Sequence, residues 1–214
     1  MKNKILFAII TVSIILATFN SCISTSKDSV EIAVIEVKPI PTKEFDEILS
    51  YNFNEDIENW GVASDSGSQP DITLDKAESN ALMFNISWGD KPDSDRWSDS
   101  VRVKADGVNL NANGANAIAF DLYIESGKTV EIPFEVVPIL QYPPSWWVQG
   151  PSITFDYSNG NDLGNGLVKY SIVAEINELT GDEVINHLLI NVIGNGTGYE
   201  GKVLLDNIAL VTTK

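Results

Sequence analysis

Short runs of alternating apolar and polar residues are the feature of this 214-residue chain that most restricts its fold. In the segment 81–88 the residues Leu82, Phe84, Ile86 and Trp88 share one parity, and similar alternation occurs in 117–125, 131–136 and 168–175. Because successive side chains of a strand point to opposite faces, this period is typical of strands with one buried face. Helical periodicity is weak, and only the stretch 182–189 fits a turn or two of helix.

Turn signals separate the alternating runs. They include Asn-Gly at 113–114 and 159–160 and a glycine-rich stretch at 194–198. The spacing gives about ten short strands with no strand–helix–strand pattern. The sequence therefore predicts an all-β protein, an antiparallel β-sandwich of the jelly-roll type, with one domain over residues 50–214.

The N-terminal residues have the pattern of an export signal. Lys2 and Lys4 precede an apolar run over 5–19, which is shorter than the roughly 20 residues that a membrane-spanning helix needs. Cys22, the one cysteine, follows this run directly after a small residue. The arrangement resembles a bacterial lipoprotein signal, in which the cysteine is lipidated and becomes the mature N-terminus. The alternative is an ordinary cleaved signal with a chance cysteine.

The lipoprotein interpretation divides the chain into three parts. Residues 1–21 are the expected signal peptide, 22–49 a lipid-anchored tether with the stretch Lys38-Pro39-Ile40-Pro41, and 50–214 the folded domain. It predicts a membrane-anchored, extracytoplasmic protein. Whether the protein faces the periplasm or the cell surface is left open.

The charge balance excludes several kinds of partner. The chain has 30 acidic and 14 basic residues, a net charge of −16, which becomes −18 when residues 1–21 and their two lysines are removed. A surface this acidic repels phosphate backbones, so we expect no nucleic-acid binding. One cysteine and one histidine also exclude an internal disulfide, a cysteine-rich zinc site and a multi-histidine metal centre.

Support for catalysis is weak. The chain has no Gly-x-Ser-x-Gly elbow and no phosphate-binding loop. The jelly-roll glucanases carry a Glu-x-Asp-x-x-Glu strand, and that spacing does not occur here. The lone His187, beside Leu188 and Leu189, is expected to be structural. We therefore predict no catalytic residues, with a small glycan-active enzyme as the alternative.

The five tryptophans divide by their surroundings. Trp60 and Trp88 have the patterns of core residues. Trp97 lies in a polar segment, and Trp146 and Trp147 follow a proline-rich turn, where the opposite directions of adjacent side chains predict that one of the pair is exposed. Exposed indoles stack on the apolar faces of sugar rings, whose hydroxyls need polar partners. For these hydroxyls we predict Arg96, Gln141 and Gln149, which lie near the tryptophans.

Two segments resemble known carbohydrate-binding modules. The opening Tyr51-Asn52-Phe53-Asn54-Glu55-Asp56, followed by Trp60-Gly61, looks like the first strand of β-sandwich modules. The segments 190–195, 199–203 and 205–210 are similar to the last strands of the mannan-binding modules of bacterial β-mannanases, carbohydrate-binding module family 27. The middle segment 117–124 is similar to a further strand of that family.

The resemblance implies a β-sandwich that binds a neutral glycan, with β-mannan favoured, through tryptophans on a concave sheet. Trp97 and Trp147 match these positions best, and Trp88 or Trp60 would be a third. It also implies a structural calcium, with Asp206 as a ligand and Asn54 where the family has Glu. Asp206 shares parity with Leu204, Ile208 and Leu210, so its carboxylate is expected to face an apolar layer. The alternative without metal has Asp206 hydrogen-bonded to backbone amides.

Together these observations predict a monomeric, non-catalytic, polysaccharide-binding lipoprotein. It would hold its glycan near the cell for partner glycanases or transporters. An adhesive or structural lipoprotein that binds protein is the remaining alternative.

Overall fold

The computed structural model describes residues 45–76, 80–88, 99–127, 134–155, 160–196 and 198–214. All regular elements in these ranges are strands. The helix predicted in 182–189 is therefore wrong: this segment contains β13 (Val184–Ile185) and the start of β14 (His187–Ile193). None of the described residues belongs to a helix that could cross a membrane.

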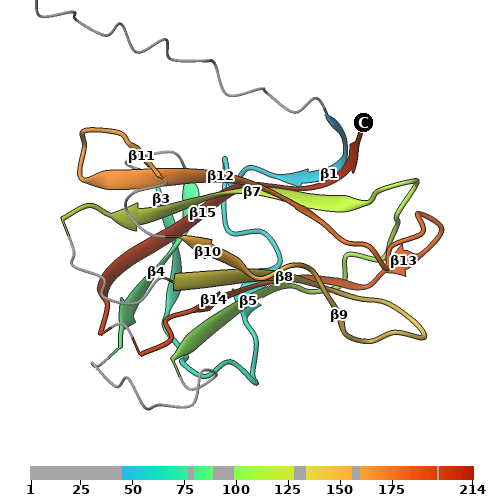
Figure 1. The fold of residues 1–214 in the computed structure, drawn as a ribbon. Coiled ribbons are helices and arrows are strands. Elements are labelled where there is room, and N and C mark those ends of the chain that lie inside the picture. The colour runs from blue at the N-terminus through green and yellow to red at the C-terminus, as the bar shows by residue number, and fades with distance from the viewer. Residues whose placement is uncertain (1–44, 77–79, 89–98, 128–133, 156–159, 197) are drawn as a thin grey trace, which may run out of the picture. The chain divides into compact units, whose positions relative to one another are not determined.

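The strands form two antiparallel sheets, which Figure 1 shows as two layers. Sheet A has the order β11-β12-β7-β15-β4-β3, with β1 also paired to β15, and sheet B has the order β10-β8-β14-β5-β2, with β9 also paired to β8. A small third sheet pairs β13 with β6. The predicted antiparallel β-sandwich is confirmed.

The bounds of the strands are as follows. Sheet A contains β1 (Phe45–Tyr51), β3 (Ile72–Asp75), β4 (Ala81–Ser87), β7 (Ala117–Glu125), β11 (Asn161–Asp162), β12 (Leu167–Glu175) and β15 (Glu200–Thr213). Sheet B contains β2 (Trp60–Val62), β5 (Ser100–Ala105), β8 (Phe134–Gln141), β9 (Val148–Gln149), β10 (Ile153–Phe155) and β14, and β6 is Leu110–Asn111.

The main core lies between the two sheets and follows the alternation of the sequence. Leu82, Phe84 and Ile86 of β4 are buried in it, and the same parity is buried in β7 and β12. Trp60 is buried as predicted, with its ring edge-on to Tyr51 at a centroid distance of 5.4 Å. Burial of each large apolar side chain contributes about 1.5–3 kcal/mol, so this layer provides most of the stabilisation.

The folded part begins earlier than the predicted boundary at residue 50. Strand β1 starts at Phe45 and pairs with β15 over residues assigned to the tether. Ile48 and Leu49 pack against the main core, and Phe45 packs on an outer cluster of sheet A. The end of the predicted tether is therefore a strand of the sandwich.

A bulge in β15 changes the direction of Asp206. The register of β15 shifts between Asp206 and Ala209, and Asn207 has a φ of 49°. Ile208 lies in the main core, whereas Leu204 packs with Tyr123 in a separate cluster on the outer face of sheet A. The prediction that Asp206 shares a face with Ile208 and Leu210 is therefore wrong, because the bulge inserts one residue between them and reverses the alternation.

Candidate functional site

The outer face of sheet B carries polar side chains above an apolar floor. Neighbouring residues in β5, β8 and β14 belong to the main core, so the intervening side chains point away from it. These outward residues are Ser100, Arg102, Lys104, Glu135, Val137, Ile139, Gln141, Gln149, His187, Leu189, Asn191 and Ile193. Among them Val137, Ile139, Leu189 and Ile193 form a buried apolar cluster.

Trp147 is a large exposed side chain on this side of sheet B. It directly precedes β9, and 43% of its surface is exposed. The Cζ atom of Arg102 lies 4.8 Å from the centroid of its ring, a cation–π contact. This contact fixes one side of the indole and leaves the rest of its surface open to a ligand.

Arg102 is itself held in place from several directions. Its side chain is 8% exposed, and Nη1 lies 2.6 Å from Oδ2 of Asp65. Its backbone N–H donates to Oγ of Ser66 at 2.9 Å, and its carbonyl accepts from the N–H of Ala63 at 2.8 Å. Because the segment 63–66 runs along β5 and supplies the counter-ion, the guanidinium is a rigid support for Trp147.

Buried polar atoms without a hydrogen-bond partner lie on the same face. In the part of the chain that the structure describes they include Nε of Arg102 and both amide atoms of Asn191, which is 0% exposed. Asn191 is in register with Arg102 on β5 and with Val137 on β8. A buried polar group without a partner costs about 1–3 kcal/mol. These atoms therefore make this layer less stable than an apolar one of the same shape would be.

A charged cluster marks one end of this face. Nζ of Lys104 lies 2.7 Å from Oδ1 of Asp106, and Nδ1 of His187 lies 3.1 Å from the same oxygen. Gln141 is in register with His187, so its half-buried side chain belongs to the same end. The cluster supplies donors and acceptors at the margin of the apolar floor.

The structure brings several predicted residues to this face. Both members of the tryptophan pair are exposed, Trp146 by 55%, and Gln149 is exposed on β9. Trp97 and Arg96 lie outside the described residues. Arg102, Asp65 and Asn191 were missed by sequence reasoning. The available signals were one arginine within the alternating strand 100–105 and one asparagine within the apolar run 188–193.

The structure corrects the prediction that Trp88 contacts the ligand. Trp88 is 3% exposed and packs in the main core. Its Nε1 donates to Oγ of Ser68 at 3.2 Å, and a Cβ added at Gly194 would lie 2.2 Å from its Cε3. Core residues and a glycine therefore enclose the ring, which has no open face for a sugar.

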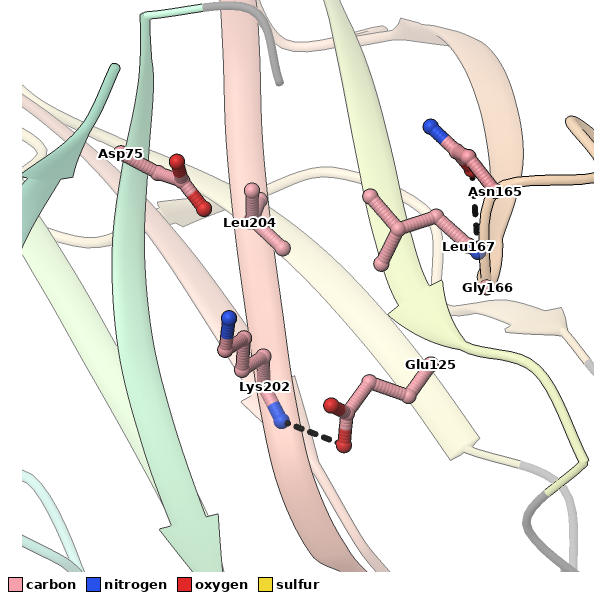
Figure 2. Close-up of a pocket in the computed structure, with 7 residues that line it drawn as sticks. All are labelled: Asp75, Glu125, Asn165, Gly166, Leu167, Lys202 and Leu204. Atoms are coloured by element: carbon pink, nitrogen blue, oxygen red, sulfur yellow. Dashed lines mark hydrogen bonds between the residues drawn. The ribbon is translucent and has the colours of Figure 1, made fainter. Parts of the chain in front are cut away.

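A separate pocket lies on the outer face of sheet A (Figure 2). This pocket of about 170 Å³ is lined by Asp75, Glu125, Asn165, Gly166, Leu167, Lys202 and Leu204. A carboxylate oxygen of Glu125 accepts from the backbone N–H of Lys202 at 3.2 Å, which Figure 2 shows as a dashed line. None of these lining residues is aromatic, so the pocket lacks the platform that Trp147 gives to sheet B.

The two residues expected to bind calcium, Asp206 and Asn54, have hydrogen-bond partners within the protein, and calcium at Asp206 stays a prediction. Both carboxylate oxygens of Asp206 accept from Asn207, from the backbone N–H at 2.7 Å and from Nδ2 at 3.2 Å. Oδ1 of the exposed Asn54 accepts instead from Asn80 at 3.4 Å. Among the described residues, no three carboxylate, histidine or cysteine side chains are grouped as a metal site would require. These contacts fit the alternative in which amides satisfy Asp206.

Asp206→Asn is expected to stabilise the protein at neutral pH. Burial, and then the nearby charge of Asp121, raise the pKa of Asp206 above its usual value. The folded state therefore disfavours the charged carboxylate, and stability falls as pH rises through this raised pKa. The amide removes this cost and keeps one acceptor for Asn207, so we expect a gain of up to about 1 kcal/mol in the free energy of unfolding, measured by urea denaturation at pH 7.

The same variant tests the predicted calcium. Without a metal at Asp206, the melting temperatures of both proteins should be equal in calcium and in chelator. A loss of stability in the variant, together with calcium-dependent melting of the wild type, would show that Asp206 is a metal ligand.

Comparison with known proteins identifies a family and two relatives. Residues 48–210 match the family model described as "Carbohydrate binding domain (family 17/28)". The chain is 24% identical over 162 residues to Endoglucanase C of Evansella cellulosilytica and 22% identical over 160 residues to an endoglucanase of Bacillus sp. strain KSM-635. These matches cover 72% and 71% of this chain but 20% and 17% of the relatives. The chain thus spans about a fifth of their length.

Solved structures with the same fold come from two module families. A family 28 module described as specific for non-crystalline cellulose has a TM-score of 0.64 at 24% identity, covering 73% of this chain and 89% of that one. A family 27 module of Caldicellulosiruptor saccharolyticus in complex with mannohexaose has a TM-score of 0.61 at 14% identity, covering 76% and 95%. The resemblance to β-sandwich carbohydrate-binding modules is confirmed, and family 27 is among the similar folds.

Proposed function

Because this chain belongs to the carbohydrate-binding domain family 17/28, we propose that it binds a polysaccharide without cleaving it, along the outer face of sheet B. Trp147 provides the stacking platform, and the polar groups around it contact sugar hydroxyls. Trp146, Gln149 and Gln141 extend this surface, and Trp97 and Arg96 remain predicted contacts.

One observation carries this proposal: the exposed indole of Trp147 lies against Arg102, on a face that also bears the outward amides of Gln141 and Gln149. A sugar ring needs an apolar platform and nearby donors and acceptors. The support from Arg102 and Asp65 holds the platform before the ligand arrives, which lowers the entropy cost of binding.

The proposed ligand is a neutral β-linked glycan. The net charge of −16 disfavours anionic chains such as polyuronates. The family and the two endoglucanase relatives favour a non-crystalline, cellulose-type β-glucan as the first candidate. β-Mannan is the second, because a module with this fold is known in complex with mannohexaose.

The setting of this function is also part of the proposal. A lipid anchor at Cys22 would place the monomeric domain outside the cytoplasm and fix it to a membrane. There it would hold glycan chains for partner glycanases or transporters. The apolar run 5–19 and the position of Cys22 directly after it support this setting.

Calorimetry against amorphous cellulose, soluble β-glucan, β-mannan and xylan tests the function. We expect binding to β-glucan, weaker or no binding to xylan, and no release of reducing sugars from any of them. A folded protein that binds none of the four would contradict the proposal. Release of products would instead support the glycan-active enzyme.

A further inference from the structure

A pocket lies beside the candidate face, where sheet B ends at β9. It encloses about 450 Å³ and is lined by Gln149, Gly150, Pro151, Glu175, Asn177 and Glu178. Three of these residues follow one another from β9, and the other three come from the end of β12 and the turn after it. The pocket therefore joins the edge of sheet B to the edge of sheet A.

Buried residues on either side fix the walls of this pocket. Ile176 and Leu179 are buried in the main core, and the N–H of Leu179 donates to the carbonyl of Ile176 at 3.0 Å. This turn leaves Asn177 and Glu178 exposed between two anchors. On the opposite wall, a Cβ added at Gly150 would lie 2.9 Å from Cγ of Pro138. The glycine therefore allows the chain to lie close against β8.

The pocket adjoins the candidate face. Gln149 belongs to both, and it follows Trp147 by two residues, about 6.6 Å along an extended chain. Oη of Tyr142 donates to the carbonyl of Glu178 at 3.3 Å, which ties the loop that carries both tryptophans to the pocket wall. Gln149 and this loop therefore connect the candidate face to the pocket.

The chemistry of the lining suits a neutral sugar. The amides of Gln149 and Asn177 offer donors and acceptors, and the carboxylates of Glu175 and Glu178 accept from hydroxyl groups. Two carboxylates on an already acidic protein disfavour a uronic acid. The pocket lies beside β9, which follows Trp147, so it is placed for a substituent of the main chain.

We propose that this pocket is a side-branch subsite, which takes a single neutral sugar attached to a glycan chain lying on the outer face of sheet B. The inference rests on the proposed function, because the main chain must first bind at Trp147. It predicts that the protein prefers branched chains to unbranched chains with the same backbone.

Calorimetry with two pairs of oligosaccharides tests this preference. One pair is cellohexaose and a xylosyl-branched gluco-oligosaccharide, and the other is mannohexaose and a galactosyl-branched manno-oligosaccharide. With its preferred backbone, the wild type should bind the branched member about five- to tenfold tighter, the gain expected from one or two additional hydrogen bonds.

The double variant Asn177→Ala/Glu178→Gln should lose this gain and bind the unbranched member within about twofold of the wild type. The control Asn161→Ala alters an exposed amide on β11, outside the pocket and the candidate face, and should keep the gain. Equal affinity of the wild type for both members of a pair, or a gain that survives in the double variant, would overturn the subsite. Failure to bind all four oligosaccharides would instead contradict the proposed function.

Discussion

Trp147→Ala should reduce the affinity for the bound glycan about 100-fold, or about 2.7 kcal/mol, the range of a tryptophan hot spot. The substitution removes the exposed platform and the cation–π partner of Arg102. Since 43% of Trp147 is exposed, it contributes little to the core, and we expect the variant to remain folded. Calorimetry with the glycan that the wild type prefers measures the loss, and circular dichroism checks the fold.

The matched control is Trp146→Ala, in the same loop and with an exposed fraction of 55%. A general loss of loop order would reduce binding equally in both variants. We expect Trp146→Ala to lose about fivefold or less, because the contact with Arg102 belongs to Trp147. Unchanged glycan binding in Trp147→Ala would exclude Trp147 as the stacking platform.

The strands of the sandwich could be predicted because their alternation is local. In β4, for example, parity alone gave the buried residues Leu82, Phe84 and Ile86, and also Trp88 just beyond it. The family resemblance nevertheless predicts Trp88 as a ligand contact, although the alternation of its own strand predicts burial. Its burial by Gly194, which is distant in sequence, supports the core assignment that parity had favoured.

Features that depend on distant pairings could not be predicted. Asp65 and Arg102 are 37 residues apart, and nothing in either segment indicates that they form an ion pair. The bulge at Asn207 depends on a conformation with positive φ that its sequence does not specify, and it changes the face on which Asp206 lies. Trp146 and Trp147 were found because two adjacent tryptophans after a proline turn cannot both enter one core.

Asn191→Leu should stabilise the protein by about 1–2 kcal/mol and leave glycan binding within about twofold of the wild type, because a side chain with no exposed surface cannot contact the ligand. The amide of Asn191 is fully buried, and neither of its polar atoms has a hydrogen-bond partner in the part of the chain that the structure describes. Leucine has a similar volume and restores the apolar floor formed by Val137, Leu189 and their neighbours. Urea denaturation and calorimetry on the same preparation measure the two effects.

The two measurements together distinguish a packing role of Asn191 from a contact with the ligand. An amide kept only for packing would leave affinity unchanged when leucine replaces it, whereas an amide kept for a ligand offsets its cost only when the ligand is bound. The control Asn85→Leu, at an exposed position of β4, should change stability by less than about 0.5 kcal/mol and leave binding intact. A variant that is more stable but binds about tenfold more weakly would contradict this placement, because it would show that the ligand reaches the amide of Asn191 below the surface formed by Trp147.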